Sequence, residues 1–558
     1  MRFLLGMTLA VSLTGCHVYR LNVEQCIVEH AAVPVDILPV DHEGTSIQPI
    51  EQDVKVNTPA VNGSVIQVTS PSEFIGGAQE KKITTIMDRL KVKDLPGAEA
   101  PEIKLPGANA PRKEVEAAIA KQFSPLPKAL SLPEPSSGPG GAPLTLANLQ
   151  QMAIENSPQI RQAHHDIDAA RGVFAQAGLY PNPTIGYEGD TIGQSNGDGK
   201  RSAGQQGGYI DQVLKTAGKL NLAKQAAQYE IEIAEQKLRQ SEADLRTQIR
   251  AKYFVLLSAK MNFEVTRSLV NLVDEVYGMG LLQLQAGEVA VYEPMQTRVL
   301  ALQSRGTLVQ AHNRYVSAWK QLAATMGMPT MTLTQVAGRI DMPVPRYEHD
   351  AVLSWVVENH TDIGMARFGV EKSRALVRMA ETQAIPDIFV HFALQKDMTA
   401  APYRRTNSLQ IGIPLPIFDR NQGAIHQARA LLRRAMLEDA RVRNDLTGRV
   451  AEVFERYENN RMILDMYKKQ MLPNQVQAYR AAVARHAVVG EKNVSYTDLV
   501  TAQQTLAGLI NSYLGALNEQ WIAVVDIGGL MQTNDLFRTG QVEEITPVPD
   551  VNELMPKR

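Results

Sequence analysis

The sequence has few cysteines, few aromatic residues and no excess of charge of either sign. Two cysteines among 558 residues exclude a disulfide scaffold and a cysteine-rich metal site. Aromatic residues make up only 6% of the chain, which is low for a protein that stacks carbohydrate on aromatic rings. Lys+Arg total 57 and Asp+Glu total 59, so the net charge of −2 gives no basic surplus, and no nucleic-acid partner is predicted.

Recognisable catalytic motifs are also missing from the sequence. It contains no GxGxxG, Walker or HExxH motif, and no cluster of Ser, His and Asp in a catalytic order. The adjacent His164 and His165 would point to different faces of a helix. Methionines such as Met462 and Met466 fit ordinary packing along a helical seam. We therefore predict that the protein is not an enzyme and has no metal site and no cofactor.

The first residues have the features of a bacterial lipoprotein signal. Arg2 gives a positive start, an apolar run follows from Phe3, and Leu13-Thr14-Gly15-Cys16 places small residues before a cysteine. This resemblance predicts a signal peptide at residues 1–15 and lipidation of Cys16, whose acyl chains would hold the protein on a membrane. The alternative is an ordinary secretory signal with an incidental cysteine. No later window holds eighteen uninterrupted apolar residues, so no transmembrane helix is expected.

Proline and glycine are concentrated in the segment that follows. Fifteen of the 30 prolines lie between Pro34 and Pro143, whereas none occurs from Gly218 to Val291. Residues 16–143 are therefore predicted to form a Pro/Gly-rich tether of extended, poorly packed chain, with one short helix from Arg112 to Gln122. An arm that binds a partner or reaches the cell wall is the alternative role for this segment.

The rest of the chain contains an internal repeat. Residues 155–160 are similar to residues 358–363, and residues 286–288 are similar to residues 489–491, with 203 positions between the members of each pair. A duplicated unit implies two like halves that pack with pseudo-symmetry. The predicted organisation is a first repeat at residues 144–330, a connection at 331–348, a second repeat at 349–531 and a tail at 532–558.

Each half is predicted to begin with a helix and two strands. The first helix, at Leu146 to Gln176 or Ala351 to Ala384, ends at a proline turn. The first half then has strands at residues 184–192 and 208–214. In the second half, residues 402–405 would form the turn between two alternating strands, whose apolar side chains are Ile388, Val390, Phe392 and Leu394, then Leu409, Ile411, Ile413 and Leu415. Alternation over about ten residues is typical of a tilted strand that crosses a bilayer.

Long helical hairpins complete each half. Apolar residues recur at steps of three and four from Lys219 to Leu284, and a helix of that length would span roughly 100 Å. Returning helices are predicted from Tyr292 to Met326 and from Tyr496 to Met531. Pro473 lies inside the long helix of the second half, and we expect it to kink or break that helix.

Four strands per chain are too few to close a barrel, and lipid does not tolerate an open sheet edge. If the strands cross a membrane, the chain must therefore oligomerise. Three copies would supply twelve strands around a water-filled lumen and would close the long helices into a tube. The sequence thus predicts a channel that joins a membrane to the compartment below it. The alternative is a non-channel, structural coiled-coil lipoprotein of the cell envelope, which needs no strands of bilayer length.

Three motifs within residues 144–531 carry a family resemblance. They are Tyr180-Pro181-Asn182-Pro183 at a strand entry, residues 413–419 (IPLPIFD) at a strand exit and residues 490–503 at a helical-hairpin tip. They resemble motifs of the outer membrane factor family of tripartite efflux systems, the TolC-like proteins. The first half departs from the pattern at its strand exit, because Gln212-Val213-Leu214-Lys215 lacks both prolines. The resemblance therefore does not define the joint between strands and helices there.

The resemblance implies a mainly α fold with a small transmembrane β part. This fold would be a TolC-like α-helical barrel with four strands per protomer in a trimeric 12-stranded outer-membrane β-barrel. It implies a homotrimer in the outer membrane of a Gram-negative-type cell, lipid-anchored and extending into the periplasm. The partners would be outer-membrane lipid, a periplasmic adaptor (membrane fusion) protein and an inner-membrane pump. The function implied is a passive duct that carries metal ions or drugs from the pump and adaptor across the outer membrane.

Four residues near the helical tips are candidates for function. Gly287 and Gly490 would lie at the periplasmic tips and mark the adaptor-docking surface, although a glycine at such a place also ends a helix. By the resemblance, Asp498 and Glu293 are candidate pore-constriction residues, because rings of carboxylates in a narrow tube favour cations. The alternative for both acids is a favourable interaction with the positive N-terminal end of a helix.

Overall fold

The structure is a computed structural model that describes most of the chain beyond residue 110. The described residues are 106, 111–132, 134–138, 141–194, 199, 201–399, 401–487, 496–538 and 540–549. The chain divides into two units, Met1–Glu99 and Ala100–Arg558, and every described residue belongs to the second. The signal at residues 1–15, Cys16 and Gly490 lie outside the described residues.

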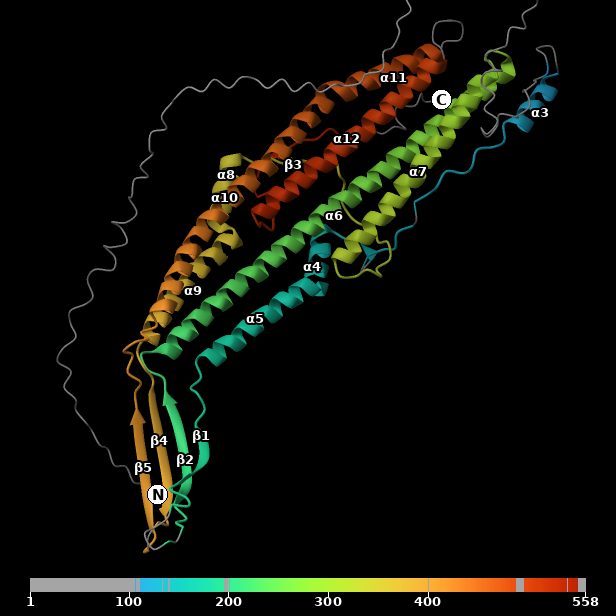
Figure 1. The fold of residues 1–558 in the computed structure, drawn as a ribbon. Coiled ribbons are helices and arrows are strands. Elements are labelled where there is room, and N and C mark those ends of the chain that lie inside the picture. The colour runs from blue at the N-terminus through green and yellow to red at the C-terminus, as the bar shows by residue number, and fades with distance from the viewer. Residues whose placement is uncertain are drawn as a thin grey trace, which may run out of the picture. The chain divides into compact units, whose positions relative to one another are not determined.

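The described part is mainly helical, and its two halves repeat one order of elements (Figure 1). The first half contains α4 (Leu146–Asn156), α5 (Pro158–Ala177), β1 (Thr184–Asp190), β2 (Gln205–Leu214), α6 (Lys219–Ala286) and α7 (Tyr292–Thr325). The second half contains α8 (His349–Asn359), α9 (Thr361–Gln383), β4 (Ile388–Asp397), β5 (Arg404–Gly412), α10 (Gln422–Met466), the π-helical turn η2 (Tyr467–Met471), α11 (Leu472–Ala487) and α12 (Tyr496–Leu530). The predicted order of helix, strand pair and long helical hairpin is therefore present in both halves.

The first helix of each half is broken, whereas the sequence predicted one continuous helix in each. Ser157 is extended (φ −66°, ψ 124°), and Pro158 then begins α5, where its missing N–H costs no helical hydrogen bond. His360 is extended in the same way and accepts a hydrogen bond from the Asp362 amide at 3.1 Å. The motif that is repeated at residues 155–160 and 358–363 therefore marks a break between two helices in each half.

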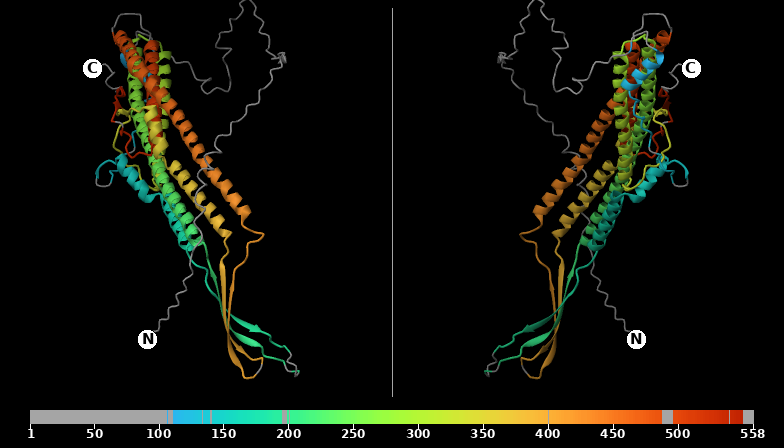
Figure 2. Two further views of the ribbon diagram at one scale, coloured as in Figure 1. Left: turned by 90° about the vertical axis from the view of Figure 1, so that its left-hand side faces the viewer. Right: turned by 90° about the vertical axis from the view of Figure 1, so that its right-hand side faces the viewer.

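The four long strands form one antiparallel sheet in the order β1-β2-β4-β5 at one end of the long helices (Figures 1 and 2). The predicted turn at residues 402–405 is wrong in part, because Arg404 and Arg405 belong to β5 and pair with Asp397 and Lys396. The predicted apolar strand end at Ile413 and Leu415 is also wrong, since β5 ends at Gly412. Pro414 and Pro416 cannot donate to a ladder, so pairing stops before them.

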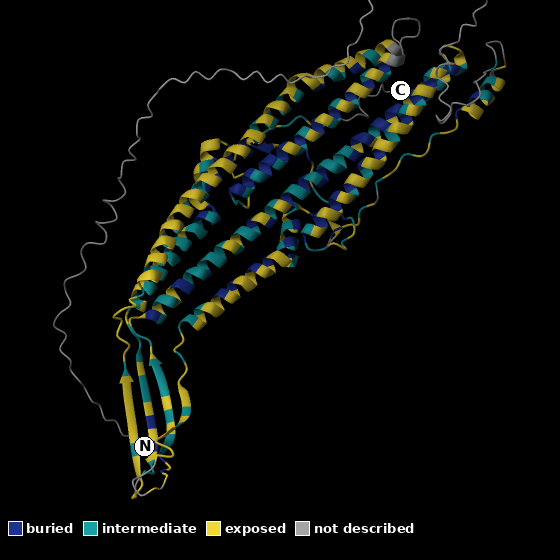
Figure 3. Ribbon diagram, in the orientation of Figure 1, coloured by how far each residue is buried: buried dark blue, intermediate teal, exposed yellow. Residues whose placement is uncertain are grey.

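The long helices meet along narrow seams, which are dark blue in Figure 3. α6 contacts α5, α7, α9 and α12, and α10 contacts α9 and α12. The core includes the fully buried Trp521, which stacks on Phe254 with ring centroids 4.1 Å apart and donates to the Ile340 carbonyl at 2.8 Å. This hydrogen bond fixes the connection between the halves, whose β3 (Val344–Pro345) pairs with β6 (Val542–Glu543) of the tail.

Pro473 interrupts the regular helix, as expected, but the helical rod continues. The π-helical turn η2 directly precedes α11, in which Pro473 is the second residue. A π turn changes the local pairing of backbone groups, so a residue without an N–H is accommodated. In the described part of the chain, no helix has both the length and the apolarity needed to cross a membrane.

The end of the predicted tether is packed rather than loosely extended. α3 (Arg112–Gln122) has the predicted bounds, and Ile119 and Phe123 are buried. Further along, the Ser136 amide donates to the Leu333 carbonyl at 2.8 Å, and the Leu144 amide donates to the Gln335 carbonyl at the same distance. Apolar side chains in this segment find partners on α6 and α7, which its composition alone did not indicate.

Candidate channel wall, junction and helical tips

One face of the four-stranded sheet is apolar. Residues paired across neighbouring antiparallel strands share a face, so the register places the following side chains together: Ile185, Tyr187, Ile210, Val390, Phe392, Leu394, Leu409 and Ile411. Ile185 is 77% exposed and Leu409 is 64% exposed. The same register also places Gln212 and Asn407 on this face, and Gln206, Lys396 and Arg405 at its end away from the long helices. An exposed sheet face that is apolar over most of its length is unfavourable in water and favourable against lipid.

The opposite face of the sheet is polar. The imidazole of His391 on β4 lies between two carboxylates, with Nδ1 2.6 Å from Asp211 Oδ1 and Nε2 3.2 Å from Glu188 Oε2. The Tyr209 ring lies 5.3 Å from the His391 ring, between centroids. The register adds Gln395, Thr406, Ser408 and Gln410 to this face. The sheet therefore has the two-sided character of a barrel wall with a hydrated interior.

A partly buried ionic junction joins the strands to the long helices. Asp387, just before β4, accepts hydrogen bonds from Lys215 Nζ at 2.8 Å, from Lys219 Nζ at 2.7 Å and from the Thr216 amide at 3.2 Å. Lys219 Nζ also donates to the Ile385 carbonyl at 2.6 Å. Lys215 ends the segment of residues 212–215, the strand exit of the first repeat, which lacks the two prolines of the motif. In this repeat, the ionic junction therefore connects the strand to the helix.

The electrostatics of the junction favour an ionised Asp387. Burial alone would raise the pKa of this carboxyl group. The hydrogen bonds from Lys215, Lys219 and the Thr216 amide outweigh burial and lower the pKa to about 2. The backbone also turns sharply here, since Ala217 and Gly218 have φ values of 56° and 69°. Two left-handed residues in succession direct the chain from β2 into α6.

At the tip of the first helical hairpin, Gly287 ends α6 with φ 76°. The Gly287 amide donates to the Leu284 carbonyl at 3.1 Å, and the Glu288 amide donates to the Gln283 carbonyl at 2.9 Å. This is the left-handed glycine cap that ends many helices. The cap explains why a glycine is needed at this position, while its role in docking stays a prediction.

The two candidate constriction acids lie at the starts of returning helices. Glu293 is half-buried in the first turn of α7, and its Oε1 accepts a weak hydrogen bond from the Ala290 amide at 3.4 Å. Asp498 is exposed in the first turn of α12. Both positions are favourable for an acid beside a helix N-terminus. A role of either residue in the pore stays a prediction.

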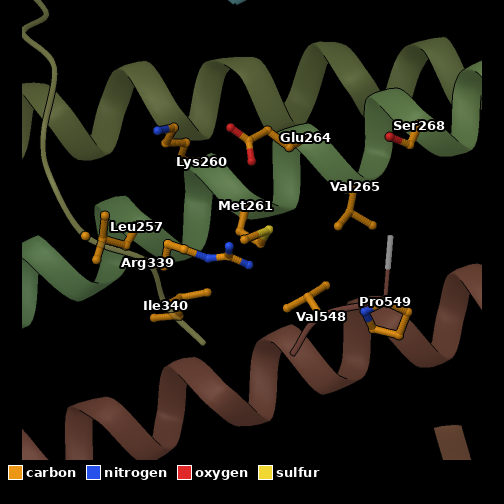
Figure 4. Close-up of a pocket in the computed structure, with 11 residues that line it drawn as sticks. Leu257, Lys260, Met261, Glu264, Val265, Ser268, Arg339, Ile340, Val548 and Pro549 are labelled. Carbon is orange, nitrogen blue, oxygen red and sulfur yellow. The ribbon is translucent and has the colours of Figure 1, made fainter. Parts of the chain in front are cut away.

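Two of the cavities in the described helical region are formed by the long helices and the segments packed on them. One of about 410 Å³ is lined by Lys260 and Glu264 of α6, Arg339 of the connection, and Val548 and Pro549 of the tail (Figure 4). The other, of about 940 Å³, lies among α6, α7 and α12. Its lining is rich in amides: Asn262, Gln310, Asn313, Gln321, Asn511 and Asn518. Within the described ranges, no group of three or more His, Cys, Asp or Glu side chains is arranged to hold a metal ion.

Sequence reasoning missed the junction and the histidine cluster. Their members are far apart in the chain, since 168 positions separate Lys219 from Asp387 and 180 separate Asp211 from His391. One signal was available for each. Asp387 follows the proline that ends the first helix of its half, and His391 occurs on the less apolar face of an alternating strand.

Comparison with known proteins gives the same picture as the geometry. Residues 149–328 and residues 352–531 each match the outer membrane efflux protein family. The cobalt-zinc-cadmium resistance protein CzcC of Cupriavidus metallidurans is 24% identical over 389 residues, which cover 70% of this chain and 90% of CzcC.

Solved structures extend the comparison. The outer membrane protein VceC of Vibrio cholerae is 16% identical, with a TM-score of 0.56 over 69% of this chain and 96% of VceC. The open MtrE outer membrane channel of Neisseria gonorrhoeae is 14% identical, with a TM-score of 0.55 over 77% of this chain and 97% of MtrE. At these identities the likeness demonstrates a shared fold.

Proposed function

Because the chain belongs to the outer membrane efflux protein family, we propose that three copies of it form one duct, with twelve strands crossing the outer membrane and the long helices extending into the periplasm. The observation that carries this proposal is the four-stranded sheet, which has one apolar face, one polar face and two edge strands. A structural coiled coil without a channel has no use for such a sheet.

The two edge strands of the sheet support an assembly of three copies. β1 and β5 are the outer strands, and each has one side without a partner strand in the described chain. In lipid, unpaired backbone groups cost several kcal/mol each, by order of magnitude, so these edges need partners. Pairing β1 of one copy with β5 of the next closes twelve strands around a threefold axis. Twelve is an even number above the minimum for a membrane barrel.

The helices offer matching surfaces for the same assembly. α7 exposes Met295, Val299, Leu302 and Val309, which step by four, three and seven residues along one side. α10 exposes Leu431, Met436, Leu437 and Met462. The apolar stripe of α7 and the exposed apolar side chains of α10 favour packing against another helix. Contact between neighbouring protomers would cover them and close the helices into a tube.

The interior of the barrel supports a cationic cargo. Asp211 and Glu188 flank His391 on the polar face, so three copies would place six carboxylates around the lumen. Rings of acidic groups favour passage of cations. The relative CzcC is a cobalt-zinc-cadmium resistance protein, which agrees with divalent metal ions as cargo. Drugs are the second cargo class, and it is favoured only by the general family resemblance.

The remaining parts of the proposal concern the two ends of the duct. A periplasmic adaptor would dock at the tips around Gly287 and Gly490 and connect the duct to an inner-membrane pump. Asp498 and Glu293 would form the constriction near those tips. Lipidation of Cys16 would add an anchor in the outer membrane. Transport through the duct would be passive, because the pump supplies the energy.

The decisive experiment measures planar-bilayer conductance and native mass on the same detergent-purified protein. We expect a trimer that opens ion-conducting channels with a preference for cations. Conversion of Asp211 and Glu188 to Asn and Gln should reduce the cation preference without removing conductance. A monomer without conductance would contradict the proposal.

A further inference from the structure

The segment that precedes the first repeat lies against the tip of the α6–α7 hairpin. We call residues 111–132 the strap. It begins with α3, which contacts α6 near the hairpin tip (Figures 1 and 2). The strap lies at the surface where an adaptor is proposed to dock, so its contacts bear on how that surface is used.

The helical part of the strap inserts an apolar edge into the tip. Val115, Ile119 and Phe123 are four residues apart, and Ile119 and Phe123 are only 4% and 6% exposed. They pack with side chains on both sides of Gly287: Tyr277, Leu281, Leu284, Val289 and Val291. The tip of this hairpin therefore binds an amphipathic helix through an i, i+4, i+8 apolar row.

The rest of the strap follows the α6–α7 seam away from the tip. After Phe123, its inward side chains recur every three residues, at Leu126, Ala129 and Leu132. Ala129 and Leu132 pack on a cluster of Phe263, Val270, Leu308 and Ala311. A step of three in a proline-containing segment is the period of an extended polyproline chain, which has no internal hydrogen bonds of its own.

Two arginines of α7 hold the backbone of the strap. Arg305 forms a bidentate ion pair with Asp274 of α6, at 2.8 Å for each nitrogen, and donates its Nε hydrogen to the Pro127 carbonyl at 2.7 Å. Arg298 donates to the Ser124 carbonyl and to the Tyr277 hydroxyl. These contacts use backbone carbonyls, so they fix the position of the strap without requiring particular strap side chains.

We propose that the tip surface formed by Tyr277, Leu281, Leu284, Val289 and Val291 is a helix-binding site that α3 fills in the resting protein, and that a helix of the periplasmic adaptor displaces α3 when the complex assembles. This inference rests on the proposed function, since it assigns the adaptor to one surface. The adaptor helix would present two or three apolar residues at the same four-residue spacing.

The energetics of α3 make it a replaceable occupant. It has eleven residues, and its N-cap, Pro111, provides no side-chain hydrogen bond. A helix of this length is marginal without tertiary contacts. It competes through its covalent attachment, which gives a high local concentration. If α3 occupies the site nine-tenths of the time, the apparent affinity of an added helix falls about tenfold.

The test compares two single substitutions in the full-length trimer. Ile119→Glu places a charge in the buried row, whereas Ala120→Glu places the same charge on the exposed side of α3. The first probe is a fluorescent peptide of the strap, residues 111–132. We expect it to bind Ile119→Glu protein about tenfold tighter than the wild type, and to bind Ala120→Glu protein like the wild type. Equal binding to all three proteins would overturn the inference. Phe123→Ala is a milder variant that serves the same purpose if Ile119→Glu protein does not assemble.

The second probe identifies the occupant in cells. The photo-crosslinking amino acid benzoylphenylalanine is placed at position 281. In the wild type we expect it to crosslink to α3. In the Ile119→Glu variant we expect it to crosslink instead to a protein with a long periplasmic helical hairpin. If the protein with the helical hairpin is labelled more strongly in the wild type than in the Ile119→Glu variant, α3 assists docking. That result would overturn the proposal that the adaptor helix displaces α3. Absence of any such labelling would exclude the adaptor as the occupant. Conductance of the same trimers tests the duct separately, because the strap is not part of the channel wall.

Discussion

Lys219 and Asp387 form an ion pair of 2.7 Å at the point where the strands meet the long helices. Lys219 begins α6 of the first half, and Asp387 immediately precedes β4 of the second. Only 8% of the Lys219 side chain and 18% of the Asp387 side chain are exposed. The pair therefore links the two repeats at the level where a membrane-spanning wall would change into a periplasmic tube.

Replacing Asp387 with Asn should destabilise the junction. Lys219 would be left buried with a weaker partner, and we expect a loss of about 1–3 kcal/mol in the free energy of unfolding of each protomer. Thermal unfolding of the detergent-solubilised protein measures it. The matched control is Asp168→Asn, which removes an exposed pair with Arg171 at 3.4 Å and should cost less than about 0.5 kcal/mol.

The same ion pair predicts a dependence on acid. The pKa of Asp387 is about 2 in the folded protein, below its ordinary value of 3.8. A carboxyl group whose pKa is lowered by folding stabilises the folded state above its unfolded pKa and loses that contribution as pH falls through its folded pKa. Between about pH 4 and pH 2, the wild type should therefore lose stability that the Asn variant already lacks, and their melting temperatures should converge. Parallel curves would contradict the ionic role.

Neighbouring residues on β5 test the two-sided sheet. Leu409 belongs to the apolar face and Ser408 to the polar face, and both lie near the middle of the sheet. Leu409→Lys would place an ammonium group against lipid at a cost of about 2–4 kcal/mol per strand near the bilayer centre, whereas Ser408→Lys would face the hydrated interior. The yield of folded trimer in the outer membrane should fall sharply only for Leu409→Lys. Similar yields for both variants would show that this face does not contact lipid.

The elements of the fold could be predicted from local sequence because local interactions determine them. α6 begins and ends within two residues of the prediction, since it lacks proline and is flanked by Gly218 and Gly287, both with positive φ. The alternating residues of β4 likewise indicated the strand directly. The break at His360 was missed because no proline marks it and its cap depends on side-chain geometry.

The parts that could not be predicted depend on distant contacts. The partners of Asp387 lie in the other half of the chain. The strap is ordered because its apolar side chains, which recur every three residues, pack into the seam between α6 and α7. Of the tip residues, Gly287 could be recognised as a helix end because positive φ strongly favours glycine. Nothing local distinguishes a helix-capping acid from a pore-lining acid, so Glu293 and Asp498 need experiments.

Arg305 should be essential for holding the strap. Arg305→Lys would keep the charge but lose the fork that binds both Asp274 oxygens and the Pro127 carbonyl together. We expect trypsin to cleave after Lys128 roughly ten times faster, because loss of about 1.5 kcal/mol in charged hydrogen bonds raises the open population of the strap about tenfold. Arg314→Lys on the exposed side of the same helix is the control and should leave the cleavage rate unchanged.

Asp498 is the candidate gate residue that single-channel recording can test most directly. It is exposed at the start of α12, so three copies in a trimer would add three negative charges near the tips. If they narrow the pore through bonds to neighbouring helices, Asp498→Ala should raise the single-channel conductance and increase antibiotic leak into cells. Glu293→Ala is the comparison, because that carboxylate accepts a hydrogen bond from the Ala290 amide and its loss should mainly weaken the start of α7. If the conductance of Asp498→Ala protein is unchanged, Asp498 only stabilises the N-terminus of α12. If Glu293→Ala raises the conductance more than Asp498→Ala does, the constriction lies at Glu293 in the first repeat.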